Sequence, residues 1–244
     1  MTAGTNSGPD ETRSSHADLL RLFGSNLIVI GFFTPDYAEA ASTFAANLIE
    51  HRVSHHLYAC AKVEGGWRAQ IFQKPAMLAV ARRDYPDAVL VFMDVDCSIR
   101  GDISKIVETR GDVALRVKGR AVGRGYALKF SSRVIVVMPT PGGAAFVDAW
   151  NSECRDHEMG TESALVPTIE HSAGSFSLAA LPLRYAGMEL RDAPADAVIV
   201  HDSIHDPQRP GWAARKGAEK LFRMARNGAF RLTTGQSYDD RRKR

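Results

Sequence analysis

The sequence predicts an α/β protein with a mostly parallel central sheet flanked by helices. A continuous apolar run, "NLIVIGFF" (26–33), is typical of a strand buried on both faces. The pattern strand, helix, strand, helix, strand then follows as far as residue 94. Two aspartates, Asp94 and Asp96, stand at the end of the third strand, where open α/β sheets bind their ligands.

The first helix is predicted from its start signals. Thr34 can cap it, Pro35 suits its first position, and apolar residues recur at helical spacing as far as Ile49. The same patterns predict strands at 54–61, 88–94, 112–117, 133–140, 176–185 and 196–202, and helices at 70–85, 143–157, 161–171 and 213–227. No internal repeat is found, so we expect a flexible lead (1–22), one folded domain (23–230) and a basic tail (231–244).

Composition excludes several classes of protein. The 244 residues are 45% hydrophobic and 24% charged, as in an ordinary globular protein. No apolar run approaches the roughly 20 residues that span a bilayer, and the polar N-terminus lacks the apolar core of a signal peptide. Three widely spaced cysteines form no disulfide or zinc pattern. We therefore expect a cytoplasmic protein.

The basic residues are concentrated at the C-terminal end. Residues 205–244 hold 11 Lys/Arg against 4 Asp/Glu. A segment of this kind can face a phosphorylated ligand or an anionic membrane, and equally can be a solvated helix face. Because no aromatic residues are interleaved with the basic ones in a recognition motif, no nucleic-acid partner is expected.

The aspartate pair suggests a metal site. In an extended strand, Asp94 and Asp96 point to the same side if that geometry continues through Val95. Two neighbouring carboxylates repel each other, and a cation relieves the repulsion. Mn²⁺ or Mg²⁺ prefers such oxygen ligands and completes its coordination with substrate phosphates. The alternative is a solvated turn with no ligand.

Two classes of enzyme place this pattern after a buried strand. "VFMDVDCSI" is similar to the motif of haloacid-dehalogenase-like phosphatases, in which Asp94 would be the nucleophile and Asp96 the acid/base. Residues 27–212 resemble the GT-A glycosyltransferases, especially the retaining bacterial galactosyl and glucosyl transferases. The resemblance rests on "FFTPDYAEAASTFAANLIEH…HHLYACA", "KPAMLAVARRDYPDAVLVFMDVDCSIRGDI" and "VIVHDSIHDPQRPGW".

The resemblance implies a donor site with a Mn²⁺ or Mg²⁺ ion. Asp94, Asp96 and His201 would bind the metal, with His205 as a weaker alternative to His201. Asp94 would also touch the ribose of a nucleotide sugar. The other donor-binding residues implied are Phe33, Thr34 and Tyr37 for base and ribose, Lys74 for the nucleotide and Arg209 for the diphosphate. Alternatively, Tyr37 only packs against neighbouring side chains, and Lys74 is a solvated lysine in the first turn of its helix.

The acceptor side is implied by "GTESALVP". Glu162 would be the catalytic residue beside Asp96, as an acceptor hydrogen-bonding group or, in an inverting enzyme, a general base. Ser163 stands where retaining enzymes often carry Gln. Glu162 can also simply favour the helix dipole.

The resemblance therefore implies a metal-dependent hexosyltransferase that makes surface polysaccharide or lipopolysaccharide. Its donor would be a UDP-sugar and its acceptor a saccharide or a lipid-linked saccharide, with retention. The basic C-terminus would allow peripheral association with the inner membrane face. A non-catalytic nucleotide-sugar-binding protein on the same fold is a further alternative.

Overall fold

The computed structural model describes residues 16–62, 73–122, 125–156 and 160–201. The chain divides into two compact units, Met1–Asp202 and Ser203–Arg244, and every described residue belongs to the first. The predicted helix at 213–227 and the predicted basic tail therefore lie outside the described residues.

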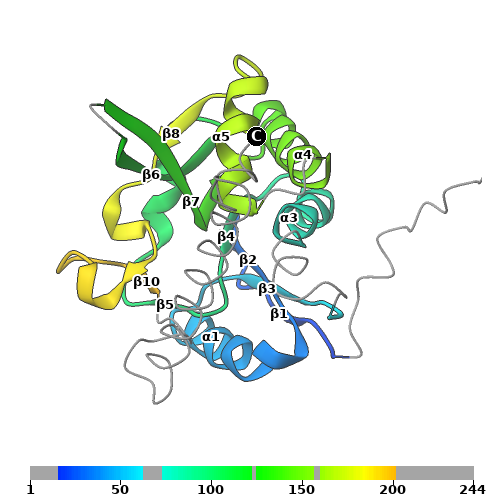
Figure 1. Ribbon diagram of the computed structural model, residues 1–244. Helices are drawn as coiled ribbons and strands as arrows, with labels where there is room; N and C mark the ends of the chain where they lie inside the picture. Colours follow the sequence, from blue (N-terminus) through cyan, green and yellow to red (C-terminus); the bar gives the residue numbers. More distant parts are fainter. Residues whose placement is uncertain (1–15, 63–72, 123–124, 157–159, 202–244) are drawn as a thin grey trace, which may run out of the picture. The chain divides into compact units, whose positions relative to one another are not determined.

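The described part of the chain contains a seven-stranded sheet with the order β1-β3-β2-β4-β7-β6-β8 (Figure 1). Its strands are β1 (Leu19–Arg21), β2 (Leu27–Phe33), β3 (His55–Ala59), β4 (Val89–Met93), β6 (Val113–Val122), β7 (Gly125–Val137) and β8 (Leu178–Ala180). β3, β2 and β4 pair in parallel, as do β6 and β8, whereas β1 and β7 run the other way. Five of the seven strands share one direction, which confirms the predicted mostly parallel α/β sheet.

Helices cover both faces of this sheet. α1 (Ala38–Glu50) packs on one face, and α3 (Gln73–Asp84), α4 (Pro141–Asp156) and α5 (Thr161–His171) pack on the other (Figure 1). Successive side chains of a strand point to opposite faces, so β2 and β4 supply both cores. Val29 and Val91 face α1, while Ile30 and Phe92 face the other helices. The continuous apolar runs in the sequence reflect this double burial.

A second, three-stranded sheet has the order β5-β10-β9. It consists of β5 (Cys97–Ile99), β10 (Ile199–His201) and β9 (Met188–Glu189). β10 is antiparallel to β5, with His201 opposite Cys97, and parallel to β9, with His201 beside Glu189. This pairing places the last described residue next to the segment that follows β4.

Several elements differ from the sequence prediction. The first helix opens with a 3-10 turn, Pro35–Tyr37. The strands predicted at 112–117 and 133–140 are parts of the longer β6–β7 hairpin. The strand predicted at 176–185 stops at Ala180 and gives way to a 3-10 helix, Leu183–Tyr185, because Pro182 has no N–H for the ladder. β1 lies within the predicted flexible lead and pairs with β3.

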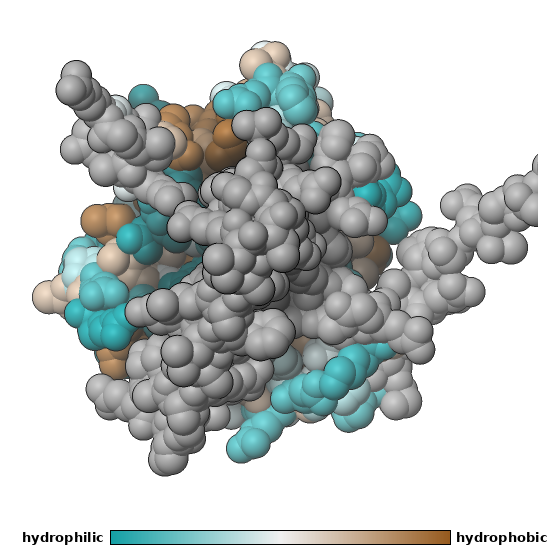
Figure 2. All heavy atoms as spheres, in the orientation of Figure 1, coloured by the Kyte–Doolittle hydropathy of each residue, from teal (hydrophilic) through white to brown (hydrophobic). Residues whose placement is uncertain are grey.

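The surface of the described residues is mixed. Figure 2 shows hydrophilic side chains on the visible face, with hydrophobic ones in separate groups. Exposed leucines such as Leu20 and Leu128 are ordinary for a globular protein. Among the helices that the structure describes, none is long and apolar enough to cross a bilayer.

Candidate metal and nucleotide site

The two aspartates lie in a tight turn between β4 and β5. The Asp94 N–H donates to the Arg133 carbonyl (3.2 Å), which ties the turn to β7, and the Cys97 N–H donates to the Asp94 carbonyl (3.0 Å). The expectation that extended geometry continues through Val95 is therefore wrong, because the chain turns back at this point. The turn, and not strand alternation, brings the two carboxylates together.

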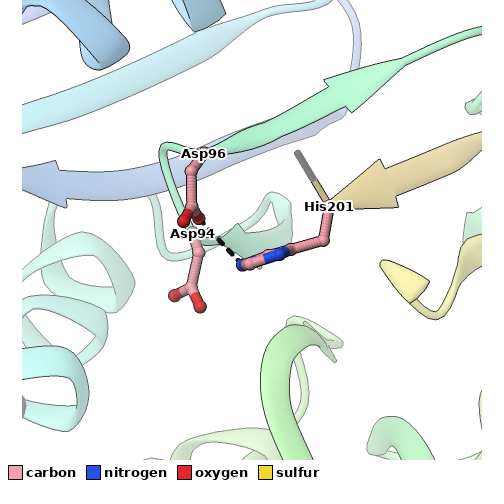
Figure 3. A group of neighbouring side chains, drawn as sticks. All are labelled: Asp94, Asp96 and His201. Atoms are coloured by element: carbon pink, nitrogen blue, oxygen red, sulfur yellow. Dashed lines mark ion pairs between the residues drawn. The ribbon is translucent and has the colours of Figure 1, made fainter. Parts of the chain in front are cut away.

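His201 reaches this turn from β10. Its Nε2 lies 3.0 Å from Asp96 Oδ1, and one potential ligand atom from each of Asp94, Asp96 and His201 lies within 4.8 Å of the others (Figure 3). His201 is only 6% exposed. The structure thus brings together the three residues predicted to bind a metal.

The other ring nitrogen of His201 faces β9. Nδ1 lies 3.4 Å from Glu189 Oε1, close enough for an ion pair when the ring is charged, yet it is buried and makes no hydrogen bond among the described residues. Glu189 Oε1 also pairs with the Arg133 guanidinium at 2.8 Å. Arg133 and Glu189 therefore form a charged layer behind the histidine, which holds the ring in place.

Burial and charge shift the pKa values of this group. Burial alone would raise the pKa of Asp96, but the hydrogen bond and charge of His201 outweigh it, so the pKa of Asp96 is lowered. The pKa of His201 is raised, because its hydrogen bond to Asp96 and the carboxylate charge outweigh burial. Burial raises the pKa of Asp94; the charge of Lys74 opposes the rise and that of Asp96 adds to it.

Lys74, in the first turn of α3, also belongs to this group. Its Nζ lies 2.5 Å from Asp94 Oδ1, and the two side chains are only 13% and 21% exposed. The amine also lies 6.0 Å from the centre of the Phe92 ring. The alternative of a solvated lysine is therefore wrong.

The residues at the end of β2 divide into two kinds. Phe33 is 4% exposed and belongs to the core beneath α1, and Thr34 is also buried. Tyr37 is partly buried at the edge of the same core. Burial raises the pKa of Tyr37, and the charges of Asp96, Asp36 and Asp94 raise it further. Tyr37 thus lies within electrostatic range of both aspartates.

Glu162 lies elsewhere, in the first turn of α5 against the β6–β7 hairpin. It accepts a hydrogen bond from Ser131 Oγ (3.2 Å), and its oxygens lie 3.8 Å from Lys118 Nζ and 3.9 Å from Lys129 Nζ. No hydrogen bond or ion pair within the described ranges joins it to the aspartates. Arg209 and His205 lie outside the described residues.

Sequence reasoning missed Arg133 and Glu189. Neither stands in a recognisable motif, since Arg133 lies within β7, directly before its apolar end, and Glu189 belongs to a two-residue strand. Their relevance follows from the pairing of β10 with β9, which local sequence does not reveal. A histidine that binds a metal ion often donates its other ring N–H to a carboxylate. An acidic residue beside His201 could therefore be expected, although not which one.

Comparison with solved structures shows the fold. A glycosyltransferase involved in the glycosylation of the major capsid of PBCV-1 matches with a TM-score of 0.52 at 12% identity, over 80% of this chain and 98% of that one. The galactosyltransferase LgtC, solved with donor and acceptor sugar analogues, matches with a TM-score of 0.47 at 12% identity, over 80% of this chain and 94% of that one.

The glycosyltransferase GlyE from Streptococcus pneumoniae TIGR4 matches with a TM-score of 0.45 at 17% identity, over 75% of this chain and 56% of that one. No family model and no curated protein matches the sequence. The match to the PBCV-1 capsid glycosyltransferase shows that the chain has a GT-A-like glycosyltransferase fold.

Proposed function

We propose that this chain is a metal-dependent glycosyltransferase that moves a sugar from a nucleotide-diphosphate donor, favoured to be a UDP-sugar, to a saccharide or lipid-linked acceptor with retention. One observation carries the proposal. Asp94, Asp96 and His201 meet at the carboxyl edge of a GT-A-like sheet, although His201 is distant from the aspartates in sequence.

The donor set fits Mn²⁺ or Mg²⁺. Two carboxylates and one imidazole offer oxygen and nitrogen ligands to a hard divalent ion. Without an ion, the Asp96 carboxylate relies on a charged His201, and two like charges remain close together. A neutral His201 can ligate through Nε2 while Glu189 accepts the proton of Nδ1. The bound ion would neutralise charge on the departing nucleoside diphosphate.

The proposal also includes the remaining donor residues. Lys74 holds Asp94 in place and supplies a cation beside the proposed phosphate position, where it can contact the donor. Tyr37 lies near the aspartates and can reach the base or ribose, with Phe33 and Thr34 forming the wall behind it. Arg209 is proposed to contact the diphosphate. The basic C-terminal residues are proposed to contact the inner membrane face.

Glu162 is proposed to receive the acceptor. Its carboxylate is held by Ser131 and flanked by two lysines, so it can accept a hydrogen bond from an acceptor hydroxyl. An acceptor-binding role agrees with retention. A general-base role would require inversion.

Thermal stabilisation by UDP, GDP and ADP, each with and without Mn²⁺, tests the donor site. A ligand at about 100 times its dissociation constant stabilises the fold by roughly 2.7 kcal/mol. One diphosphate should stabilise the wild type only with Mn²⁺, and Asp96→Ala should abolish the effect. Asp87→Ala is the matched control, because Asp87 lies in an exposed turn before β4.

The alternatives give different results. A haloacid-dehalogenase-like phosphatase, with Asp94 as its nucleophile, would instead release phosphate from simple esters. A non-catalytic protein would bind the nucleotide sugar with Mn²⁺ and never hydrolyse it, even slowly. Absence of any diphosphate response at saturation would reject the donor site itself.

A further inference from the structure

The β6–β7 hairpin extends past the edge of the sheet at which the aspartates lie. β7 is antiparallel to β4, and Val134 pairs with Met93, the last residue of β4. The part of β7 before Val134, and the β6 residues paired with it, therefore continue beyond the carboxyl end of β4 (Figure 1). Asp94 follows Met93 at this same end.

One face of this extension is cationic. Arg116 pairs with Ser131, and Lys118 pairs with Lys129, so these four side chains share a face by strand alternation. Glu162 meets this face, in contact with Ser131 and within 4 Å of both lysines. The charge of Arg133 acts on Lys118 and on His201 alike, so the hairpin and the proposed metal group lie within electrostatic range of the same guanidinium.

Among the residues that the structure describes, the cations on this face outnumber the carboxylates. Lys118 and Lys129 share the single carboxylate of Glu162. Arg116 has no hydrogen bond or ion pair among the described residues, and its Nε is buried without a partner. The described residues of this face therefore offer three cations and one carboxylate. By contrast, the charges of Lys74, Arg133 and His201 are each matched by a carboxylate.

This arrangement is costly in the absence of a ligand. Like charges directly opposite each other in an antiparallel pair destabilise the sheet. A buried guanidinium nitrogen with no acceptor costs its desolvation energy as well. A phosphate bound between the two lysines and Arg116 would offset both costs, and Arg and Lys are the side chains with which proteins commonly bind phosphate.

We propose that Arg116, Lys118 and Lys129 form a phosphate-binding subsite on the β6–β7 hairpin, and that the acceptor carries a phosphate group which binds there. The acceptor role rests on the proposed glycosyltransferase function, whereas the binding of phosphate does not. The subsite holds the phosphate while Glu162, in the same cluster, faces the rest of the acceptor.

Phosphate binding without metal tests the subsite. Inorganic phosphate is titrated in EDTA at low ionic strength, and the melting temperature is followed for the wild type, Asp96→Ala and the double variant Lys118→Met/Lys129→Met. The double variant should bind phosphate roughly tenfold more weakly or worse, since it loses two charge-assisted contacts. Lys62→Met/Lys105→Met, which removes two exposed lysines elsewhere, should respond as the wild type does.

The outcomes separate this subsite from the donor site. The subsite is supported if inorganic phosphate stabilises the wild type and Asp96→Ala but does not stabilise the double variant. No stabilisation of the wild type, an equal response in the double variant, or loss of the response in Asp96→Ala would overturn it. UDP with Mn²⁺, added separately, shows whether the double variant is folded. If UDP binding fails in every protein while the phosphate results hold, the proposed function fails and the subsite stands.

Two further probes identify the source of the phosphate. Flotation with phosphatidylcholine vesicles, with and without phosphatidic acid, tests a lipid-borne phosphate, and glucose 1-phosphate tests a sugar-borne one. Vesicle binding that needs both phosphatidic acid and the two lysines supports a lipid-linked acceptor. Stabilisation by glucose 1-phosphate without vesicle binding supports a soluble sugar phosphate. Each test is repeated with the single variant Lys129→Met. This change carries little risk to folding, because the Lys129 side chain is 52% exposed.

Discussion

Replacement of Lys74 by Met should destabilise the metal-free protein considerably. The change keeps the length and apolar stem of the side chain and removes the cation that pairs with Asp94 at 2.5 Å. Loss of one partner from a fully buried ion pair costs about 3–5 kcal/mol. Because Asp94 is 21% exposed and can take up a proton, we expect roughly 2 kcal/mol near neutral pH.

Urea denaturation in EDTA measures this loss, and an exposed pair provides the control. Lys62 and Asp36 also lie 2.5 Å apart, but their side chains are 62% and 58% exposed. Lys62→Met should therefore cost less than about 1 kcal/mol. A similar loss in both variants would show that burial of the Lys74 pair is unimportant, and would refute the reasoning.

The pH dependence gives a second check. Burial already raises the folded-state pKa of Asp94, and loss of the Lys74 charge raises it further. An ionised Asp94 in Lys74→Met therefore destabilises the fold increasingly as the pH rises through that pKa. The difference from wild type should therefore grow as the pH rises and shrink as the pH falls, because protonation of Asp94 removes the unpaired charge. A difference that grows as the pH falls would contradict this cause.

Three further predictions concern the core. Trp150→Ala should lower the free energy of unfolding, measured by urea denaturation, by about 4 kcal/mol, because Trp150 is fully buried and donates to the Thr161 carbonyl (3.1 Å). A loss below about 1 kcal/mol would contradict this packing. Tyr58→Phe should lower the free energy of unfolding by about 1 kcal/mol, because it removes the hydroxyl that donates to Asp84 (2.7 Å). Unchanged stability would mean that this hydrogen bond contributes nothing. All three cysteines are buried (Cys60, Cys97 and Cys154), and burial raises the pKa of Cys154 to about 12. A thiol reagent should therefore react with them only after denaturation. Fast reaction in the native state would contradict this burial.

Most of the central sheet could be predicted from local sequence. β2 and β4 are buried on both faces, so every residue is apolar and the runs stand out. The β6–β7 hairpin extends beyond the predicted strands, because its extension carries Arg116, Lys118 and Lys129 and has no continuous apolar run. A register shift between Leu115 and Arg116 interrupts the pattern again.

The candidate site was predictable in part. The spacing of Asp94 and Asp96 indicated a cation, and the resemblance to a family implied His201. The turn that brings the aspartates together and the carboxylate of Glu189 depend on how β5, β9 and β10 pair, which is tertiary information. Lys74 was selected as a donor contact, and the structure adds its buried ion pair with Asp94.

The position of β10 also has a consequence for synthesis. All strands of the seven-stranded sheet come from the chain before Leu181, whereas His201 follows later. On the ribosome, the two aspartates therefore emerge well before the histidine that completes their group. A nascent chain can assemble its sheet around Asp94 and Asp96 but cannot close the three-residue group until β10 pairs with β5. Only a chain translated past His201 can thus bring all three side chains together.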